Sequence, residues 1–133
     1  MKYCADTWFI LALYGADETA KRILHDVKEG KTRLIIPIVV YSESWKKLLQ
    51  KGISENDIER FYGSLLSSER IQIAMMDSTI AKEAAKISLH ASIPLIDSMV
   101  AATCRLTDCH VLLSGDSDYI ILQKKKYLKV QSW

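Results

Sequence analysis

The sequence has no long apolar run and no apolar leader. Its longest apolar stretches, such as Leu34 to Tyr41, fall well short of the roughly 20 residues that a membrane-spanning helix requires. Asp6 interrupts the short apolar segment behind Met1, where the apolar region of a signal peptide would stand. We therefore expect neither a transmembrane helix nor secretion, and we predict a cytoplasmic protein.

Cysteine and histidine are also scarce. The three cysteines, Cys4, Cys104 and Cys109, are an odd number in a chain without an export signal, which favours reduced thiols. The spacing of Cys104 and Cys109 is not that of a zinc knuckle, and no histidine pair completes four ligands. No histidine lies in a recognisable motif with a serine or cysteine nucleophile. We expect no structural metal.

The net charge is small, +2, from 18 basic and 16 acidic residues. Such a balance does not by itself indicate nucleic acid, so the distribution of charge has to decide. Hydrophobic residues make up 49% of the chain and charged residues 26%, which is typical of globular proteins. At 133 residues the chain is about one domain long, and we expect one domain over residues 1–133.

Segments of strand and helix character alternate along the chain, without repeats or a linker. Apolar runs and alternating patterns predict strands, and amphipathic spacing with caps predicts helices between them. The expected strands are 2–5, 34–36, 71–75, 111–113 and 128–131; the expected helices are 7–14, 17–28, 37–50, 54–66, 77–89 and 94–106, with a short one before the last strand. This order predicts an α/β fold, a three-layer sandwich with a central, mainly parallel sheet.

Two acids follow predicted strands directly. Asp6 comes after strand 2–5, and Asp116 comes after strand 111–113 through Ser114 and Gly115, where glycine permits a tight turn. Open parallel sheets bind ligands beyond the carboxyl ends of their strands. Each acid also precedes a helix, so taken singly each is better explained as an N-cap.

Asp97 is the one charged residue between Ile93 and Cys104, in a helix that is otherwise apolar or small on all sides. Such a helix is expected to be buried, and burying an unpaired carboxylate is costly, so a nearby cation is the simplest explanation. Asp118 follows Asp116 by two residues, and this Asp-Ser-Asp triplet fits either a metal-binding turn or a solvated loop.

Glu43 and Asp77 illustrate the alternative roles of an acid. A helical wheel places Glu43 opposite the stripe of Ile38, Tyr41, Trp45 and Leu48, where it would make a surface pair with Lys47 four residues on. The sequence therefore favours a functional role for Glu43 no more than it favours a surface ion pair with Lys47. Asp77 follows a strand and fits helix capping without further help, so we leave it out of the site.

Four segments together resemble the PIN-domain pattern. They are Asp6-Thr7 after the first strand, Pro37 with Glu43 six residues on, Asp97-Ser98 with Val100-Ala101-Ala102, and Ser114-Gly115-Asp116 with Asp118-Tyr119. The resemblance covers nearly the whole chain, and a lone domain of this size is similar to the VapC-like toxins of prokaryotic toxin-antitoxin pairs. It implies a nuclease with the acidic quartet Asp6, Glu43, Asp97 and Asp116, with Asp118 as an auxiliary acid and Ser114 in the place of a common Thr or Ser. It also implies an antitoxin partner and a homodimer.

Converging carboxylates repel one another and become tolerable with divalent cations between them, and oxygen ligands favour Mg²⁺ or Mn²⁺. The resemblance implies metal-dependent hydrolysis of RNA to 5'-phosphate products, with Asp6, Asp97 and Asp116 as metal ligands and Glu43 as a ligand or an orienter of the attacking water. RNA must approach this acidic pocket, so flanking cations are candidates for phosphate contacts, although solvated surface lysines are the commoner case. The cations in question are Lys46 and Arg105, and beyond them Lys47, Lys51 and residues 124–126. The uncharged Ser114 is a further candidate for contact with the substrate.

Two alternatives remain open at this stage. A receiver-like signalling domain also gathers acids and Mg²⁺ at the ends of a parallel sheet, but it would show an acid pair after the first strand, where Asp6 stands alone. A PIN-like fold could also bind or process RNA without this cleavage, although every expected acid is present.

Overall fold

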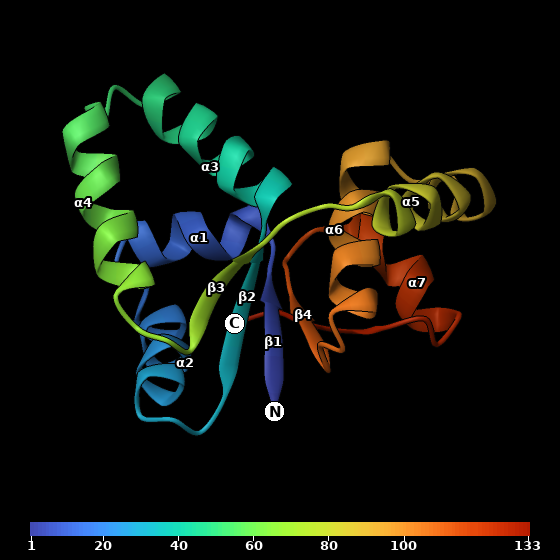
Figure 1. The fold of residues 1–133 in the computed structure, drawn as a ribbon, viewed down its shortest axis with the longest axis horizontal. Coiled ribbons are helices and arrows are strands. Elements are labelled where there is room, and N and C mark those ends of the chain that lie inside the picture. The colour runs from blue at the N-terminus through green and yellow to red at the C-terminus, as the bar shows by residue number, and fades with distance from the viewer.

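Five parallel strands form the centre of the molecule in the computed structural model, which describes all 133 residues. The strands pair in the order β3-β2-β1-β4-β5 (Figure 1). Their bounds are β1 Lys2–Ala5, β2 Arg33–Pro37, β3 Ile71–Ala74, β4 Val111–Leu113 and β5 Lys129–Gln131. The predicted sheet is therefore present and is parallel throughout.

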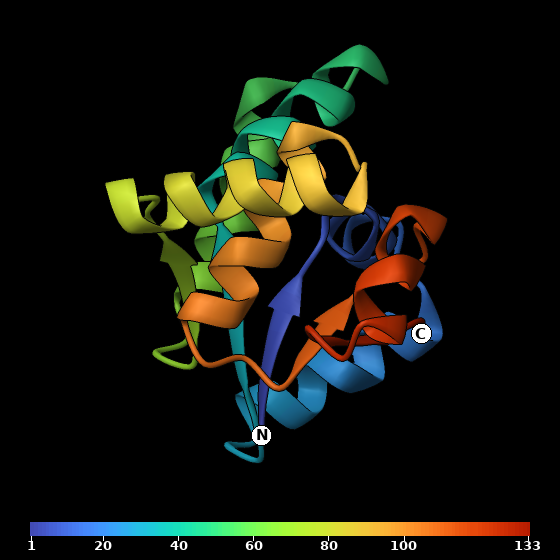
Figure 2. The ribbon, with the colours of Figure 1, turned by 90° about the vertical axis from the view of Figure 1, so that its right-hand side faces the viewer.

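Helices cover both faces of this sheet. In Figure 1, α1, α2, α3 and α4 lie to one side of the strands, and α5, α6 and α7 lie to the other. Turning the molecule shows α5 lying across α6, against which it packs (Figure 2). The bounds are α1 Thr7–Tyr14, α2 Glu18–Lys28, α3 Ile38–Gln50, α4 Glu55–Leu66, α5 Ser78–Ala91, α6 Leu95–Leu106, a 3-10 turn at Ser117–Tyr119 and α7 Ile120–Lys124. The predicted three-layer α/β sandwich is confirmed.

The core runs through the middle strands. Cys4 and Ala5 of β1, residues 34–36 of β2 and all of β4 are buried, as a parallel sheet covered on both faces requires. Side chains from the flanking helices, among them Phe9 and Ile58, complete one hydrophobic cluster with these strands. None of the helices is long and apolar enough to cross a membrane.

Two details of the helices differ from the sequence-based expectation. Pro37 and Pro94 occupy the cap positions before α3 and α6 rather than the first helical turn. Of the stripe predicted for α3, Leu48 is buried, and Tyr41 and Trp45 are partly buried against the core. The other fully buried residues of the helix are Val40 and Ser44, whose hydroxyl shares a 2.5 Å hydrogen bond with the Tyr62 hydroxyl. The buried face is therefore turned relative to the predicted one, and Glu43 is half-buried at its edge instead of exposed on the far side.

The first turn of α6 also departs from expectation. The helix was predicted to be buried on all sides, and from Val100 to Cys104 it is. Leu95 and Ile96 are exposed, however, because the turn that contains Asp97 emerges at the edge of the sheet. Asp97 is accordingly half-buried rather than enclosed.

The strand order places a topological switch point between β1 and β4. The chain builds β1, β2 and β3 outward on one side and then crosses back to place β4 and β5 on the other. At such a point the connections that follow the two neighbouring strands lead away from each other, which leaves a crevice outside the carboxyl ends of the strands. Receiver domains have the order 2-1-3-4-5, so the receiver-like alternative is wrong.

Candidate active site

Asp6 stands at the carboxyl end of β1, at the switch point. Its backbone N–H continues the ladder by donating to the Leu113 carbonyl of β4 at 3.1 Å. Its side chain is buried, 4% exposed, and makes no capping hydrogen bond to α1 although it occupies the cap position. The Ser114 hydroxyl instead donates to Asp6 Oδ2 at 2.7 Å. Helix capping, the simpler explanation of this acid from sequence, is therefore wrong for Asp6.

Three further acids meet at the same edge. Carboxylate oxygens of Asp97, Asp116 and Asp118 lie within 4.8 Å of one another. Asp97 comes from the first turn of α6, and the other two come from the turn after β4. The four ion pairs of the structure all lie elsewhere, so no lysine or arginine neutralises these charges.

The mutual repulsion shows in the pKa of Asp97, which is raised to about 7. Partial burial is the largest cause, and a hydrogen bond with Asp118 and the charges of Asp116 and Asp6 add to it. Burial also raises the pKa of Asp6, and the Ser114 hydrogen bond opposes that rise. The site thus penalises the ionised form of both acids, and a positive charge placed between them would offset that penalty.

Asp116 combines a cap with a place in this cluster. Its carboxylate accepts a 2.9 Å hydrogen bond from the Asp118 N–H, which starts the 3-10 turn. Its own N–H donates to the Ser114 hydroxyl oxygen at 3.0 Å. Ser114 therefore connects Asp6 and the Asp116 turn through one buried hydroxyl group. The capping explanation describes Asp116 correctly but incompletely.

Glu43 is held by a residue that the sequence-based reasoning did not single out. The buried Thr7 hydroxyl donates to Glu43 Oε1 at 2.5 Å, joining the first turn of α1 to α3. No ion pair with Lys47 forms, so the predicted surface pair is wrong. The only signal for Thr7 in the sequence is its position directly after Asp6. The charge of Glu43 contributes to the raised pKa of Asp6, so the two carboxylates interact electrostatically.

Tyr119 lies beneath the acids. Its ring is fully buried and its hydroxyl has no hydrogen-bond partner. Burial raises the pKa of this hydroxyl, and the charges of Asp6, Asp97 and Asp116 raise it further. A buried polar atom without a partner is rare in a folded protein. An unpaired hydroxyl therefore lies close enough to the acids for their charges to act on it.

These donors fit a hard divalent cation. All of them are oxygens, which is the ligand set of Mg²⁺ and Mn²⁺. A cation among Asp97, Asp116 and Asp118 would offset the repulsion that raises the pKa of Asp97. The sequence had placed Asp118 outside the ligand set, whereas in the structure one of its carboxylate oxygens lies within 4.8 Å of those of Asp97 and Asp116.

The candidate phosphate contacts separate into two places. Lys46 is exposed and lines a cavity of about 290 Å³ together with Glu43 and Ile96. Arg105 lies in the last turn of α6, eight residues after Asp97, which is about 12 Å along the helix axis. Its guanidinium group bonds to the Tyr127 carbonyl and stacks over that ring at 5.0 Å. The structure therefore brings Lys46 to the site and leaves Arg105 away from it.

Solved structures with this fold include toxin-antitoxin complexes. VapBC2 from Rickettsia felis, bound to a DNA fragment from its promoter, is similar with a TM-score of 0.78 and 14% identity over 100% of this chain and 99% of that one. VapBC-1 from nontypeable Haemophilus influenzae has a TM-score of 0.72 and 20% identity over 100% and 98%. VapC20 from Mycobacterium tuberculosis, a toxin that cleaves the Sarcin-Ricin loop, has a TM-score of 0.65 and 16% identity over 89% and 92%.

No curated protein sequence matches the chain at a significant level. The family model of the PIN domain matches residues 3–125, which contain β1 except for its first residue, every later element up to α7, and all five acids of the site. On this match, and with the fold and strand order described above, the chain belongs to the PIN-domain family.

Proposed function

We propose that this protein is a metal-dependent endoribonuclease whose active site consists of Asp6, Glu43, Asp97, Asp116 and Asp118. The observation that carries the proposal is the cluster of Asp97, Asp116 and Asp118, which has no counter-cation and lies at the switch point of a PIN-domain sheet. A carboxyl group whose pKa is raised by burial and by the charges of neighbouring acids, as that of Asp97 is, is typical of a functional site rather than of a structural one.

The proposed roles follow from the contacts of each residue. A bound Mg²⁺ or Mn²⁺ ion would supply the charge that neutralises the acids and the Lewis acidity that activates water for attack on a phosphodiester. Asp97 and Asp116, whose carboxylate oxygens lie within 4.8 Å of each other and of Asp118, would hold the ion together with Asp6, whose charge acts on Asp97; Asp118 would complete or orient this set. Glu43, fixed by Thr7, would accept a hydrogen bond from the attacking water and orient it for in-line attack. The product would be a 5'-phosphate.

We further propose that the protein is the toxin of a toxin-antitoxin pair and acts in the cytoplasm as a homodimer. The similar structures from Rickettsia felis and Haemophilus influenzae are of VapBC pairs, which supports a cognate antitoxin here. Exposed apolar side chains also flank the acids along the chain: Trp8 follows Asp6 by two residues, Ile96 precedes Asp97, and Ile120 follows Asp118 by two. Such side chains around a polar site suit a protein partner.

The direct test is cleavage of RNA by the purified protein. We expect cleavage of single-stranded or structured RNA with Mg²⁺ or Mn²⁺ and complete loss in EDTA. Asp6→Asn and Asp97→Asn should each abolish turnover. Asp77→Asn is the matched control, because Asp77 caps α5 by accepting from the Ile80 N–H at 2.8 Å and asparagine caps equally well.

Each alternative predicts a different result. Undiminished cleavage in EDTA would contradict a metal mechanism. If Asp77→Asn lost as much activity as Asp6→Asn and Asp97→Asn, the proposed site would not distinguish its own acids from a helix cap, and its geometry would be wrong. Metal-dependent RNA binding without any cleavage would indicate an RNA-binding module in place of a nuclease. A neighbouring gene for a DNA-binding antitoxin would test the toxin assignment independently of all these assays.

A further inference from the structure

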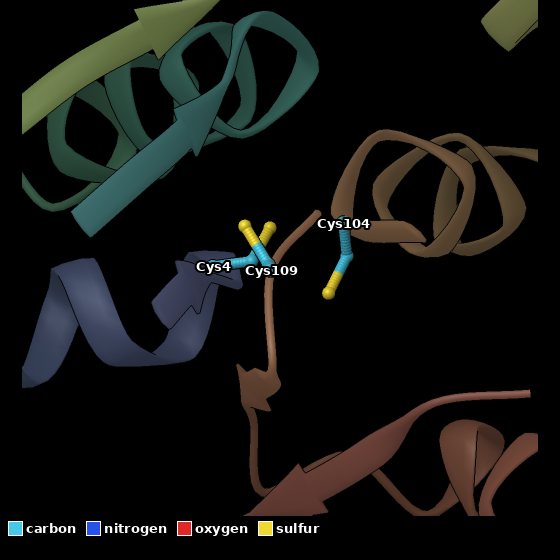
Figure 3. Close-up of side chains that lie close together, drawn as sticks. All are labelled: Cys4, Cys104 and Cys109. Carbon is cyan, nitrogen blue, oxygen red and sulfur yellow. The ribbon is translucent and has the colours of Figure 1, made fainter. Parts of the chain in front are cut away.

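All three cysteines of the chain come together at one place in the fold (Figure 3). Cys4 belongs to β1, Cys104 to the last turn of α6, and Cys109 to the segment between α6 and β4. Their sulfur atoms lie within 4.8 Å of one another. Cys4 and Cys104 are fully buried, whereas Cys109 is half-buried. Sequence spacing alone gave no reason to expect this cluster, because Cys4 is about a hundred residues from the other two.

The end of α6 holds Cys109 against Cys104. The Cys109 N–H donates to the Cys104 carbonyl at 3.0 Å, and the Asp108 N–H donates to the Arg105 carbonyl at 3.3 Å. Asp108 has a φ of 59°, in the left-handed region. These are the features of a Schellman motif, in which the second residue beyond the cap contacts the third residue from the helix end. The backbone therefore holds the two residues side by side, with their sulfur atoms within 4.8 Å of each other.

Cys109 is the member of the cluster that solvent can reach. It lines a cavity of about 590 Å³ whose other walls include Arg105, Lys126 and Lys129. These cations favour an anion at the floor of the cavity. The Thr107 hydroxyl lies 3.3 Å from the Cys109 sulfur. Small anionic or neutral reagents that enter this cavity thus reach Cys109, whereas Cys104 is fully buried.

The surroundings also favour a thiolate at Cys109. The pKa of its thiol is lowered to about 3, mainly because the neighbouring Cys104 thiol, and after it the Cys4 thiol, stabilises the negative charge on its sulfur against the opposing effect of burial. The Thr107 hydroxyl and the charge of Lys2 act in the same direction. Low pKa, access to solvent and a neighbouring thiol are together the features of cysteines that react with oxidants.

We propose that Cys109 is a peroxide-reactive thiol and that Cys104 is its resolving partner. In the first step the Cys109 thiolate attacks one oxygen of a hydroperoxide, the O–O bond breaks, and Cys109 becomes a sulfenic acid while the other oxygen leaves as hydroxide or alkoxide. In the second step the Cys104 sulfur attacks the sulfenic sulfur, the S–O bond breaks, and water leaves after the Cys104 proton reaches the departing oxygen. Two thiols are oxidised to one disulfide, and the hydroperoxide is reduced.

Cys104 is a better partner than Cys4 for a structural reason. A disulfide between Cys104 and Cys109 would close a loop of a few residues within one capping motif, whose backbone already holds the two together. Cys4 is a residue of β1, paired on both sides in the middle of the sheet, so its backbone has little freedom to move toward a sulfur. Its thiol instead lies within 4.8 Å of the Cys109 sulfur and stabilises the reactive form.

The experiment treats the reduced full-length protein with hydrogen peroxide and counts thiols after denaturation. Free thiols should fall from three to one per chain, with a loss of two hydrogens in the intact mass and a linked peptide containing Cys104 and Cys109. Dithiothreitol should restore all three. Cys104→Ser should instead give a Cys109 sulfenic acid that dimedone traps, Cys109→Ser should lose no thiols at the same dose, and Cys4→Ser should still form the disulfide.

A second measurement does not depend on the disulfide. Alkylation of Cys109 by iodoacetamide, followed by mass spectrometry, should change by less than about tenfold between pH 8 and pH 5.5, whereas an ordinary thiol with a pKa near 8.5 would slow by roughly a hundredfold or more. Thermal melts of each variant identify any that fail to fold, and Cys104→Ala then replaces Cys104→Ser. The proposal is overturned if Cys109→Ser still loses two thiols, if Cys4 is the linked partner, or if a tightly bound metal protects all three thiols.

Discussion

Ser114 and Asp6 join the carboxyl ends of β4 and β1 through a single buried hydrogen bond of 2.7 Å. The same Ser114 oxygen accepts from the Asp116 N–H, so one hydroxyl fixes two of the proposed metal ligands. Its one donor is used by Asp6, and one of its two acceptor lone pairs is used by the Asp116 N–H. In this structure Ser114 orients the acids, and the contact with RNA predicted for it from sequence stays a prediction.

This relationship predicts that Ser114→Ala lowers cleavage by roughly 10- to 100-fold, because residues that orient metal ligands usually contribute that much. The pKa of Asp6 should rise further, since the hydrogen bond that opposes its rise is lost. Ser114→Thr keeps the hydroxyl and should retain most activity. Activity with titrated Mg²⁺ is the measurement, and full activity of Ser114→Ala at low Mg²⁺ would contradict the role.

A second prediction concerns the stability of the metal-free protein. The pKa of Asp97 is raised to about 7, so the folded state binds a proton more tightly than the unfolded state does. Stability should then fall as pH rises from the ordinary carboxyl range to about 7, and it should be lowest above that value. In EDTA, Asp97→Asn should flatten this dependence and melt at a higher temperature than the parent near neutral pH.

Added Mg²⁺ should reverse that order, because the parent gains stability by binding the ion and the variant, with one ligand lost, gains less. Thermal melts of both proteins from pH 5 to pH 8, each with EDTA and with excess Mg²⁺, provide the comparison. A less stable variant in EDTA, together with a parent that ignores Mg²⁺, would mean that Asp97 is only an acid at the start of a helix.

The sequence was sufficient to predict the sheet, and together with the resemblance to PIN domains it also indicated the acids at its edge. Strand-helix alternation predicts the parallel order of elements, and Asp6 and Asp116 follow two of the predicted strands. It was also sufficient to set Asp77 apart as a cap, because that role depends on neighbouring residues alone. Features of this kind are local, and the local pattern determines them.

Features that depend on packing between distant elements could not be predicted. The hydrogen bond from Thr7 to Glu43 requires α1 to lie against α3, and the exposed edge of α3 depends on the pairing of Ser44 with Tyr62. The cysteine cluster likewise requires β1 to lie next to β4. In each case the sequence contained the residues, and only the tertiary arrangement determined which of them meet.

A third prediction follows from the Thr7–Glu43 contact. Thr7→Val keeps the shape of the buried side chain and removes the hydroxyl that holds Glu43. We expect kcat to fall by roughly 10- to 100-fold with little change in KM, because the residue orients a catalytic acid and does not bind substrate. Thr7→Ser retains the donor and should stay near the parent. Steady-state kinetics of both variants, with melts to confirm folding, decide the matter; a change confined to KM would place Glu43 outside the chemistry.

The last prediction separates two cations that the sequence treated alike. Lys46 is exposed beside Glu43, where a phosphate of RNA entering the site would pass. Arg105 is bound to Tyr127 at the other end of α6. Lys46→Ala should therefore raise KM severalfold, and it should reduce by about 1 the slope of log binding constant against log salt concentration, because one phosphate contact is lost.

Arg105→Ala is the matched control for the removal of one positive charge. It should leave KM and the salt slope unchanged while it lowers the melting temperature, since the contacts with the Tyr127 carbonyl and ring are lost. RNA binding measured by fluorescence anisotropy at several salt concentrations, using Asp97→Asn to prevent cleavage, gives both slopes. If the two alanine variants change the salt dependence of RNA binding equally, RNA also contacts the far end of α6. If only Arg105→Ala changes it, the proposed direction of approach is wrong.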